Sequence, residues 1–113
     1  MTMTNHESGN RVIAEFGGYK LITEFPPNVY QKGNKRLTSI SFHKPKMFGE
    51  LMNLVDYLEQ KYDLYIAVKR KQCIIQKMHL TSNRTIVNIE GKSKQDAVWL
   101  AVVDFINWYK QKL

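Results

Sequence analysis

The apolar residues of this chain change their spacing twice after residue 46, and this change restricts the fold more than any other feature. Residues three or four positions apart form a first stripe: Phe48, Leu51, Met52, Val55, Leu58 and Tyr62. This spacing predicts a helix over 46–61, because an α-helix returns to the same face every 3.6 residues. From residue 64 the apolar residues alternate with others, which predicts extended strands. A second long helix is then expected from residue 93.

The alternating segment divides into three short strands. Turn-forming residues at 70–72 and 81–84 separate strands over 64–69, 73–80 and 85–90. Ser93 and Asp96 form a capping-box-like start for a helix that runs to about Lys112. We therefore expect an α+β fold in which a three-stranded antiparallel meander packs on helices.

The first 45 residues are less regular. Residues 1–9 are polar and are expected to be a disordered tail. Asn10 is expected to cap a short helix that ends at Gly17 and Gly18, with a strand over 11–16 as the alternative. An extended segment over 19–25 then precedes a basic loop to about Arg36.

Residues 37–42 have a half-buried extended pattern whose place in a sheet stays open. With 113 residues, the chain has the size of one domain. We expect that domain to span 10–113, with a core over 46–113 and an N-terminal extension over 10–45.

The last helix has more apolar surface than one sheet face can cover, since Trp99, Leu100 and Val103 lie in or beside its polar sector. Either the N-terminal segment packs over this surface or a partner does. The first arrangement is favoured, because Val12 and Phe16 otherwise have nothing to pack against. The second would make Trp99, Leu100 and Val103 an apolar interface for another protein or for a homodimer.

Positive charge is concentrated in two parts of the chain. The formal net charge is +7, from 17 Lys and Arg against 10 Asp and Glu. Two windows, 25–49 and 64–89, contain no acidic residue and hold ten basic ones. The basic residues of the windows, with two more beside the last helix, are our candidate binding residues: Lys32, Lys35, Arg36, Lys44, Lys46, Lys69, Arg70, Lys71, Lys77, Arg84, Lys92 and Lys94.

A basic surface of this kind indicates an anionic partner. Nucleic acid fits best, because regularly spaced phosphates engage several Lys and Arg side chains at once and release counterions. An acidic protein could satisfy the same charges, and solubility alone is the third interpretation.

The residues that could carry catalysis are scattered. His6, His43 and His79 are far apart in sequence, so no metal site is expected. Cys73 begins a strand and is expected to be a core residue rather than a nucleophile. We expect no enzyme activity, no cofactor and no small-molecule substrate. No apolar run approaches the roughly 18 residues that cross a bilayer, and no secretory signal is present, so we expect a cytoplasmic protein without a membrane partner.

The order helix, three antiparallel strands, helix resembles the double-stranded RNA-binding domain. The segment Gly91-Lys92-Ser93-Lys94-Gln95-Asp96-Ala97 is similar to the one that opens the final helix of that family. The resemblance implies that Lys92 and Lys94 point at phosphates across a groove of the RNA. Two features depart from the family: Val98 replaces an expected lysine, and Lys71-Gln72 replaces a Gly-Pro-x-His turn.

A second resemblance covers nearly the whole chain. The segments 10–19 (NRVIAEFGGY) and 101–109 (AVVDFINWY), with the helix that contains 51–55 between them, resemble small phage and mobile-element proteins of Bacteroidetes. This resemblance implies a mobile-element origin rather than an activity. Together with the two basic windows, it motivates our leading hypothesis, an anti-defence role of the anti-CRISPR type. Such a protein would bind RNA or a host ribonucleoprotein stoichiometrically, for example a type VI-B RNA-guided nuclease or its guide RNA. The alternative is a protein-protein interaction module or homodimer that uses the C-terminal helix.

Overall fold

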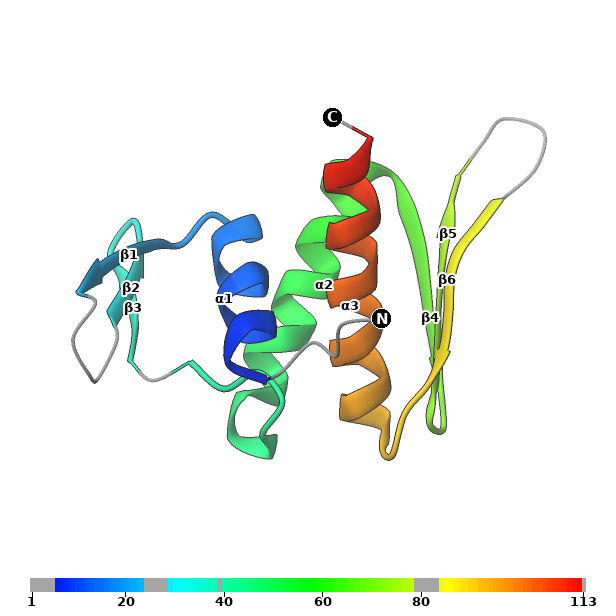
Figure 1. The fold of residues 1–113 in the computed structure, drawn as a ribbon, viewed down its shortest axis with the longest axis horizontal. Helices are drawn as coiled ribbons and strands as arrows, with labels where there is room; N and C mark the ends of the chain where they lie inside the picture. Colours follow the sequence, from blue (N-terminus) through cyan, green and yellow to red (C-terminus); the bar gives the residue numbers. More distant parts are fainter. Residues whose placement is uncertain (1–5, 24–28, 39, 79–83, 113) are drawn as a thin grey trace.

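A computed structural model of the chain describes residues 6–23, 29–38, 40–78 and 84–112. The fold is α+β, as predicted, with two three-stranded antiparallel sheets at opposite ends and the helices between them (Figure 1). The molecule is elongated and measures 47 × 29 × 28 Å. In chain order its elements are α1 (His6–Phe16), β1 (Lys20–Thr23), β2 (Val29–Lys32), β3 (Lys35–Thr38), the 3-10 helix η1 (Pro45–Met47), α2 (Phe48–Tyr62), β4 (Leu64–Lys69), β5 (Gln72–Lys77), β6 (Arg84–Glu90) and α3 (Lys94–Gln111).

The larger sheet is the predicted meander, with strand order β4-β5-β6. Arg70 takes the left-handed conformation (φ 55°) in the two-residue turn that joins β4 to β5. Alternation places Cys73, Ile75 and Val87 in the core, on the face against which α3 packs. The strand expected over 73–80 ends at Lys77. The last two residues of that expectation, 79–80, lie outside the described residues.

Helix α3 lies between this sheet and α1, so it is buried on nearly every side (Figure 1). Its buried residues are Ala97, Val98, Trp99, Ala101, Val102, Val103, Phe105 and Ile106. The packing of the N-terminal segment over α3 was the favoured expectation, and it is confirmed. The alternative, an apolar docking surface on this helix, loses support at Trp99 and Val103, because α1 and neighbouring segments leave them only 1% and 2% exposed. Leu100 is half-buried.

Helix α1 begins at His6, whereas the expected helix begins after a cap at Asn10. Residues 6–9, expected in a disordered tail, therefore belong to the helix, whereas 1–5 lie outside the described residues. Asn10 is not its cap: it lies inside α1 and is 2% exposed. The predicted end of the helix is confirmed, because Phe16 is its last residue and Gly18 follows with φ +95°.

The smaller sheet, β1-β2-β3, was largely missed in the sequence. The expected loop up to Arg36 instead contains β2 and the start of β3, joined by a tight turn in which Gly33 has φ 59°. Of the extended pattern over 37–42, residues 37–38 lie in β3, and 40–42 form no strand. These four-residue strands were hard to recognise because they bury little: Tyr30 is their one fully buried side chain among the described residues.

Helix α2 follows η1 and confirms the predicted stripe, since Leu51, Val55 and Leu58 are at most 2% exposed. Asp63 ends the helix in the left-handed conformation, φ 56°, with its N–H bonded to the Glu59 carbonyl. Strand β4 then begins immediately. No helix within the described ranges is both long and apolar enough to cross a membrane.

Candidate nucleic-acid interface

Four chain segments that are distant in sequence meet at one end of the molecule, the lower end in Figure 1. They are the β4–β5 turn, the β6–α3 loop, the first turn of α3 and the residues just before α2. The backbone N–H of Gly91 donates to the Lys71 carbonyl at 2.8 Å, which holds the loop against the turn. Gln95 Nε2 donates to the Phe42 carbonyl at 2.8 Å, which ties α3 to the segment before α2.

These segments bring together seven exposed basic residues, which we call the basic end: Lys44, Lys46, Lys69, Arg70, Lys71, Lys92 and Lys94. Glu90 and Asp96 are the acidic residues on the same segments. In the described part of the chain none of the seven forms a salt bridge, because the one ion pair present joins Lys35 to Glu50. The seven positive charges of the basic end therefore outnumber the two negative ones on the same segments.

The start of α3 fixes the backbone that carries two of these lysines. Ser93 is the N-cap, and its Oγ accepts a hydrogen bond from the Asp96 N–H at 3.1 Å. The Asp96 carboxylate in turn accepts from the Lys92 N–H at 2.7 Å. This confirms the predicted capping box in a shifted form, since the carboxylate reaches residue 92 rather than the cap itself.

Gly91 makes the close approach of β6 to α3 possible. A Cβ at this position would lie 2.5 Å from the backbone nitrogen of Ala97 and 2.9 Å from its Cα. Only glycine fits there without movement of the helix. The N-terminus of α3 is thus held beside Lys71, and the partial positive charge of its dipole adds to the side-chain charges.

The β4–β5 turn also borders an open hollow with a volume of about 670 Å³, lined by Lys69, Arg70, Lys71, Gln72 and Glu90. Three of its five lining residues are cations, and one is an acid. The hollow is open and its lining residues are all charged or polar, which suits contact with a hydrated anionic surface rather than enclosure of a small apolar ligand.

Three other candidate residues lie on the smaller sheet, where they contact groups of the protein itself. Lys32 Nζ donates to the Gly17 carbonyl at 2.8 Å and lies 4.6 Å from the ring centroid of Tyr57. Lys35 Nζ bonds both carboxylate oxygens of Glu50 at 2.7 Å, and this hydrogen bonding raises the Lys35 pKa. The Arg36 Nε donates to Gln31 at 3.1 Å. The two basic windows of the sequence therefore do not form one continuous surface.

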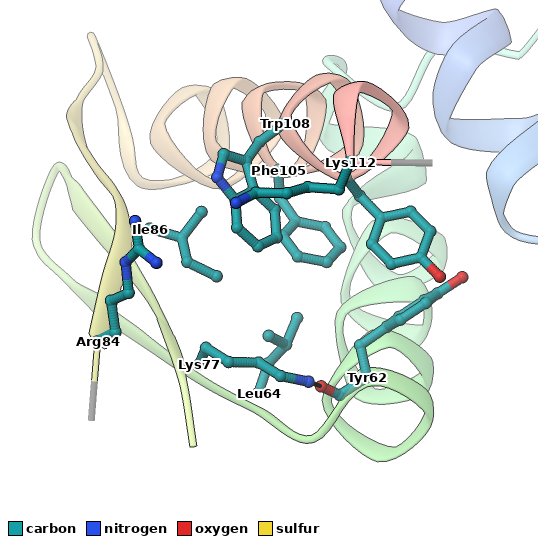
Figure 2. Close-up of a pocket in the computed structure, with 9 residues that line it drawn as sticks. Tyr62, Leu64, Lys77, Arg84, Ile86, Phe105, Trp108 and Lys112 are labelled. Atoms are coloured by element: carbon teal, nitrogen blue, oxygen red, sulfur yellow. Dashed lines mark hydrogen bonds between the residues drawn. The ribbon is translucent and has the colours of Figure 1, made fainter. Parts of the chain in front are cut away.

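The last two candidates, Lys77 and Arg84, pair across β5 and β6 at the end of the sheet away from the β4–β5 turn. They line a pocket beside the C-terminal part of α3 (Figure 2). Its other cation, Lys112, and its ring residues Trp108 and Tyr109 were not recognised as site residues in the sequence. The spacing of Trp108, Tyr109 and Lys112 predicts that they lie on one face of a helix. Only the tertiary structure places Arg84 opposite that face.

The residues considered for catalysis are Cys73 and the three histidines. Cys73 is fully buried, and burial raises the pKa of its thiol to about 11, so it is the expected core residue. The rings of His6 and His43 stack with centroids 3.9 Å apart. His79 lies outside the described residues. Among the residues that are described, no three His, Cys, Asp or Glu side chains are grouped so that they could hold a metal ion.

Comparison with known proteins gives no identity for the chain. No family model matches it, and no match was found among the curated proteins or the solved structures. The two family resemblances seen in the sequence therefore remain predictions.

Proposed function

We propose that the chain is a binding protein whose basic end contacts the phosphate backbone of RNA. The convergence of seven unpaired cations from four segments is the observation that carries this proposal. Phosphates along a nucleic acid are regularly spaced, so a strand can engage several of these side chains together. Contacts to the backbone would position the RNA without reading its sequence.

The geometry of the basic end favours phosphate over an acidic protein surface. The N-terminus of α3, where the helix dipole has its partial positive charge, lies beside Lys92 and Lys94, an arrangement that suits a compact anion. Arg70 projects from a tight turn, where its planar guanidinium can bind two oxygens of one phosphate. The competing interpretation, an apolar docking helix, loses support because Trp99 and Val103 are buried within the chain.

RNA is preferred to DNA because of the order of elements. A turn between two strands and the N-terminus of the following helix contribute to one surface, as the resemblance to the double-stranded RNA-binding domain implies. The resemblance to small phage proteins extends the proposal to an anti-defence role in the host cytoplasm. In that role the protein would bind an RNA-guided nuclease or its guide RNA stoichiometrically, and addition of equimolar protein should stop target cleavage in vitro.

The binding test uses fluorescence anisotropy of a labelled RNA hairpin over a series of salt concentrations. The variant Lys69→Ala/Arg70→Ala/Lys71→Ala removes three charges from the basic end. Its plot of log K against log salt should become less steep by about one for each phosphate that the variant no longer binds.

The matched control removes three exposed lysines elsewhere, as Lys20→Ala/Lys61→Ala/Lys110→Ala, with the same change in net charge. This control should keep the steep salt dependence. The proposal fails if both triple variants lose affinity equally, because net charge alone would then explain binding. A partner whose binding hardly changes with salt would indicate protein docking instead.

A further inference from the structure

The pocket beside the C-terminal part of α3 differs in character from the basic end. It has a volume of about 290 Å³ and lies between α3, the larger sheet and the end of α2 (Figure 2). Rings contributed by α3 and α2 line one part of it, namely Phe105, Trp108, Tyr109 and Tyr62. Aliphatic side chains of β4 and β6, Leu64 and Ile86, line another part. The interior is therefore apolar and ring-rich.

The rings are held in place by their own contacts. The Tyr62 and Tyr109 rings have centroids 4.7 Å apart, and those of Phe105 and Trp108 are 6.0 Å apart. Phe105 is 1% exposed, whereas Trp108 is half-buried. A firmly packed ring thus supports a partly accessible one, which is the condition for a stacking platform.

The charged residues of the pocket all have the same sign. Lys77, Arg84 and Lys112 are its only ionisable side chains besides the two tyrosines, and no carboxylate lines it within the described residues. Lys77 Nζ donates to the carbonyl of Tyr62, and the Lys112 amine lies 5.0 Å from the ring centroid of Trp108. Arg84 is exposed at the start of β6. The pocket therefore combines apolar walls with a cationic rim.

We propose that this pocket binds a nucleotide, with the base against the ring of Trp108 and the phosphate at Arg84 and Lys112. A flat ring that carries an anionic group complements both the ring-rich wall and the cations. The volume is at the lower end of the range for small-ligand sites, which suits one nucleotide and is too small for a long acyl chain.

This pocket is separate from the basic end, because the two lie at opposite ends of the 18-residue helix α3. The nucleotide can come from either of two sources, a free mononucleotide or one nucleotide of a single strand. The pocket would confer a preference for unpaired bases, which the backbone contacts of the basic end cannot provide. Nucleotide binding by the pocket and RNA binding by the basic end can therefore be tested independently.

The two tryptophans of the chain allow a direct test by NMR. The indole N–H of Trp99 is buried and bonded to Asn10, so its resonance is an internal control, whereas that of Trp108 reports on the pocket. Titration of the full chain with AMP should shift the Trp108 resonance in a saturable way and leave that of Trp99 in place. Adenosine and ribose 5-phosphate, each of which lacks one half of the ligand, should bind at least about fivefold more weakly.

Variants of exposed residues test the site without disturbing the core. Arg84→Ala should weaken AMP binding about fivefold to tenfold. Arg70→Ala, the same change in the basic end, should leave it unaltered. If Arg84→Ala alters the fold, a second pocket variant, Lys112→Ala, tests the expected loss of AMP affinity.

Other outcomes would overturn the proposal. One is no movement of the Trp108 resonance at millimolar AMP, and another is an equal loss of AMP affinity in Arg70→Ala and Arg84→Ala. The third is binding of octanoate in place of AMP, because the ligand would then be an anion with an acyl chain. A tetra-adenylate that binds at least as tightly as AMP would identify a strand as the source. A tetra-adenylate that binds more weakly than AMP would identify the free nucleotide.

Discussion

The indole Nε1 of Trp99 donates a 2.8 Å hydrogen bond to Oδ1 of Asn10, although the two residues are 89 positions apart in the chain. The same oxygen accepts from the Phe42 N–H at 3.1 Å. The amide nitrogen of Asn10 donates to Nδ1 of His43 at 3.0 Å and to the Ile40 carbonyl at 3.4 Å. One buried side chain thus joins α1, α3 and the segment before α2, and this segment carries part of the basic end.

Replacement of Asn10 should strongly destabilise the fold. In Asn10→Ala, the N–H groups of Trp99 and Phe42 lose their acceptor while they remain buried. The free energy of unfolding should fall by about 2–4 kcal/mol, measured by urea denaturation. Asn107→Ala, an exposed asparagine on α3, is the control and should change it by at most about 0.5 kcal/mol. Equal effects of the two substitutions would disprove this role of Asn10.

Stability should depend on the protonation of His43. Its pKa is lowered chiefly because the ring is partly buried, with further contributions from His6 and Lys44. The unfolded chain therefore binds this proton more readily than the folded chain does. The contribution of the neutral His43 ring to the free energy of unfolding is fully present above pH of about 6.5 and is lost as the pH falls below that value.

Chemical denaturation of the wild type and of His43→Asn at pH 7.5 and pH 5.5 checks this expectation. The wild type should lose more unfolding free energy between the two pH values than the variant, which has no titrating ring at this position. Identical losses would assign the pH dependence to other groups.

Substitution of Gly91 should disrupt the start of α3. In Gly91→Ala the new Cβ would meet the backbone of Ala97 at 2.5 Å, so the helix or the loop has to move. We expect a loss of more than about 2 kcal/mol in unfolding free energy and a weaker contribution of Lys92 to RNA binding. Gly49→Ala, in α2, meets no atom within 4 Å and should stabilise the protein by up to about 1 kcal/mol. Thermal melts of the two variants should therefore shift in opposite directions.

Cys73 should be unreactive in the folded protein. Its thiol is fully buried, and burial raises the pKa from 9.0 to about 11, so the thiolate is about 100-fold scarcer than in an open thiol. A thiol-specific reagent such as Ellman's reagent should react with one thiol per chain in urea, since the chain has one cysteine. Rapid reaction of the native protein would show that the sheet opens easily or that the thiol is accessible.

The helices and strands after residue 46 were predictable because their patterns are local. The stripe that ends at Tyr62 and the alternation that begins at Leu64 each indicate which side of an element is buried. The end of α1 at Gly17 and Gly18 was predictable for the same reason, since it depends on one backbone conformation. Strand β2 was missed because its four residues contain one fully buried side chain and no long pattern.

The basic character of the chain was also evident in the sequence, but the grouping of its charges was not. Lys71 and Lys92 share a surface because the Gly91 N–H bonds the Lys71 carbonyl, whereas Lys35 is occupied by Glu50. Interactions of this kind depend on how elements pack, and a charge window along the chain carries no information about them. Arg84 likewise joins Trp108 in a pocket only because β6 lies beside α3.

The sequence by itself determined the order of helices and strands after residue 46, the end of α1 and that the surface is strongly positive, because these properties arise from neighbouring residues. The tertiary structure alone decided that Trp99 is covered by the chain itself, which cations face solvent together, and which rings enclose a pocket. The physical reason is that burial, hydrogen bonding and charge pairing between distant segments depend on three-dimensional packing, and local periodicity specifies a face without specifying what covers it.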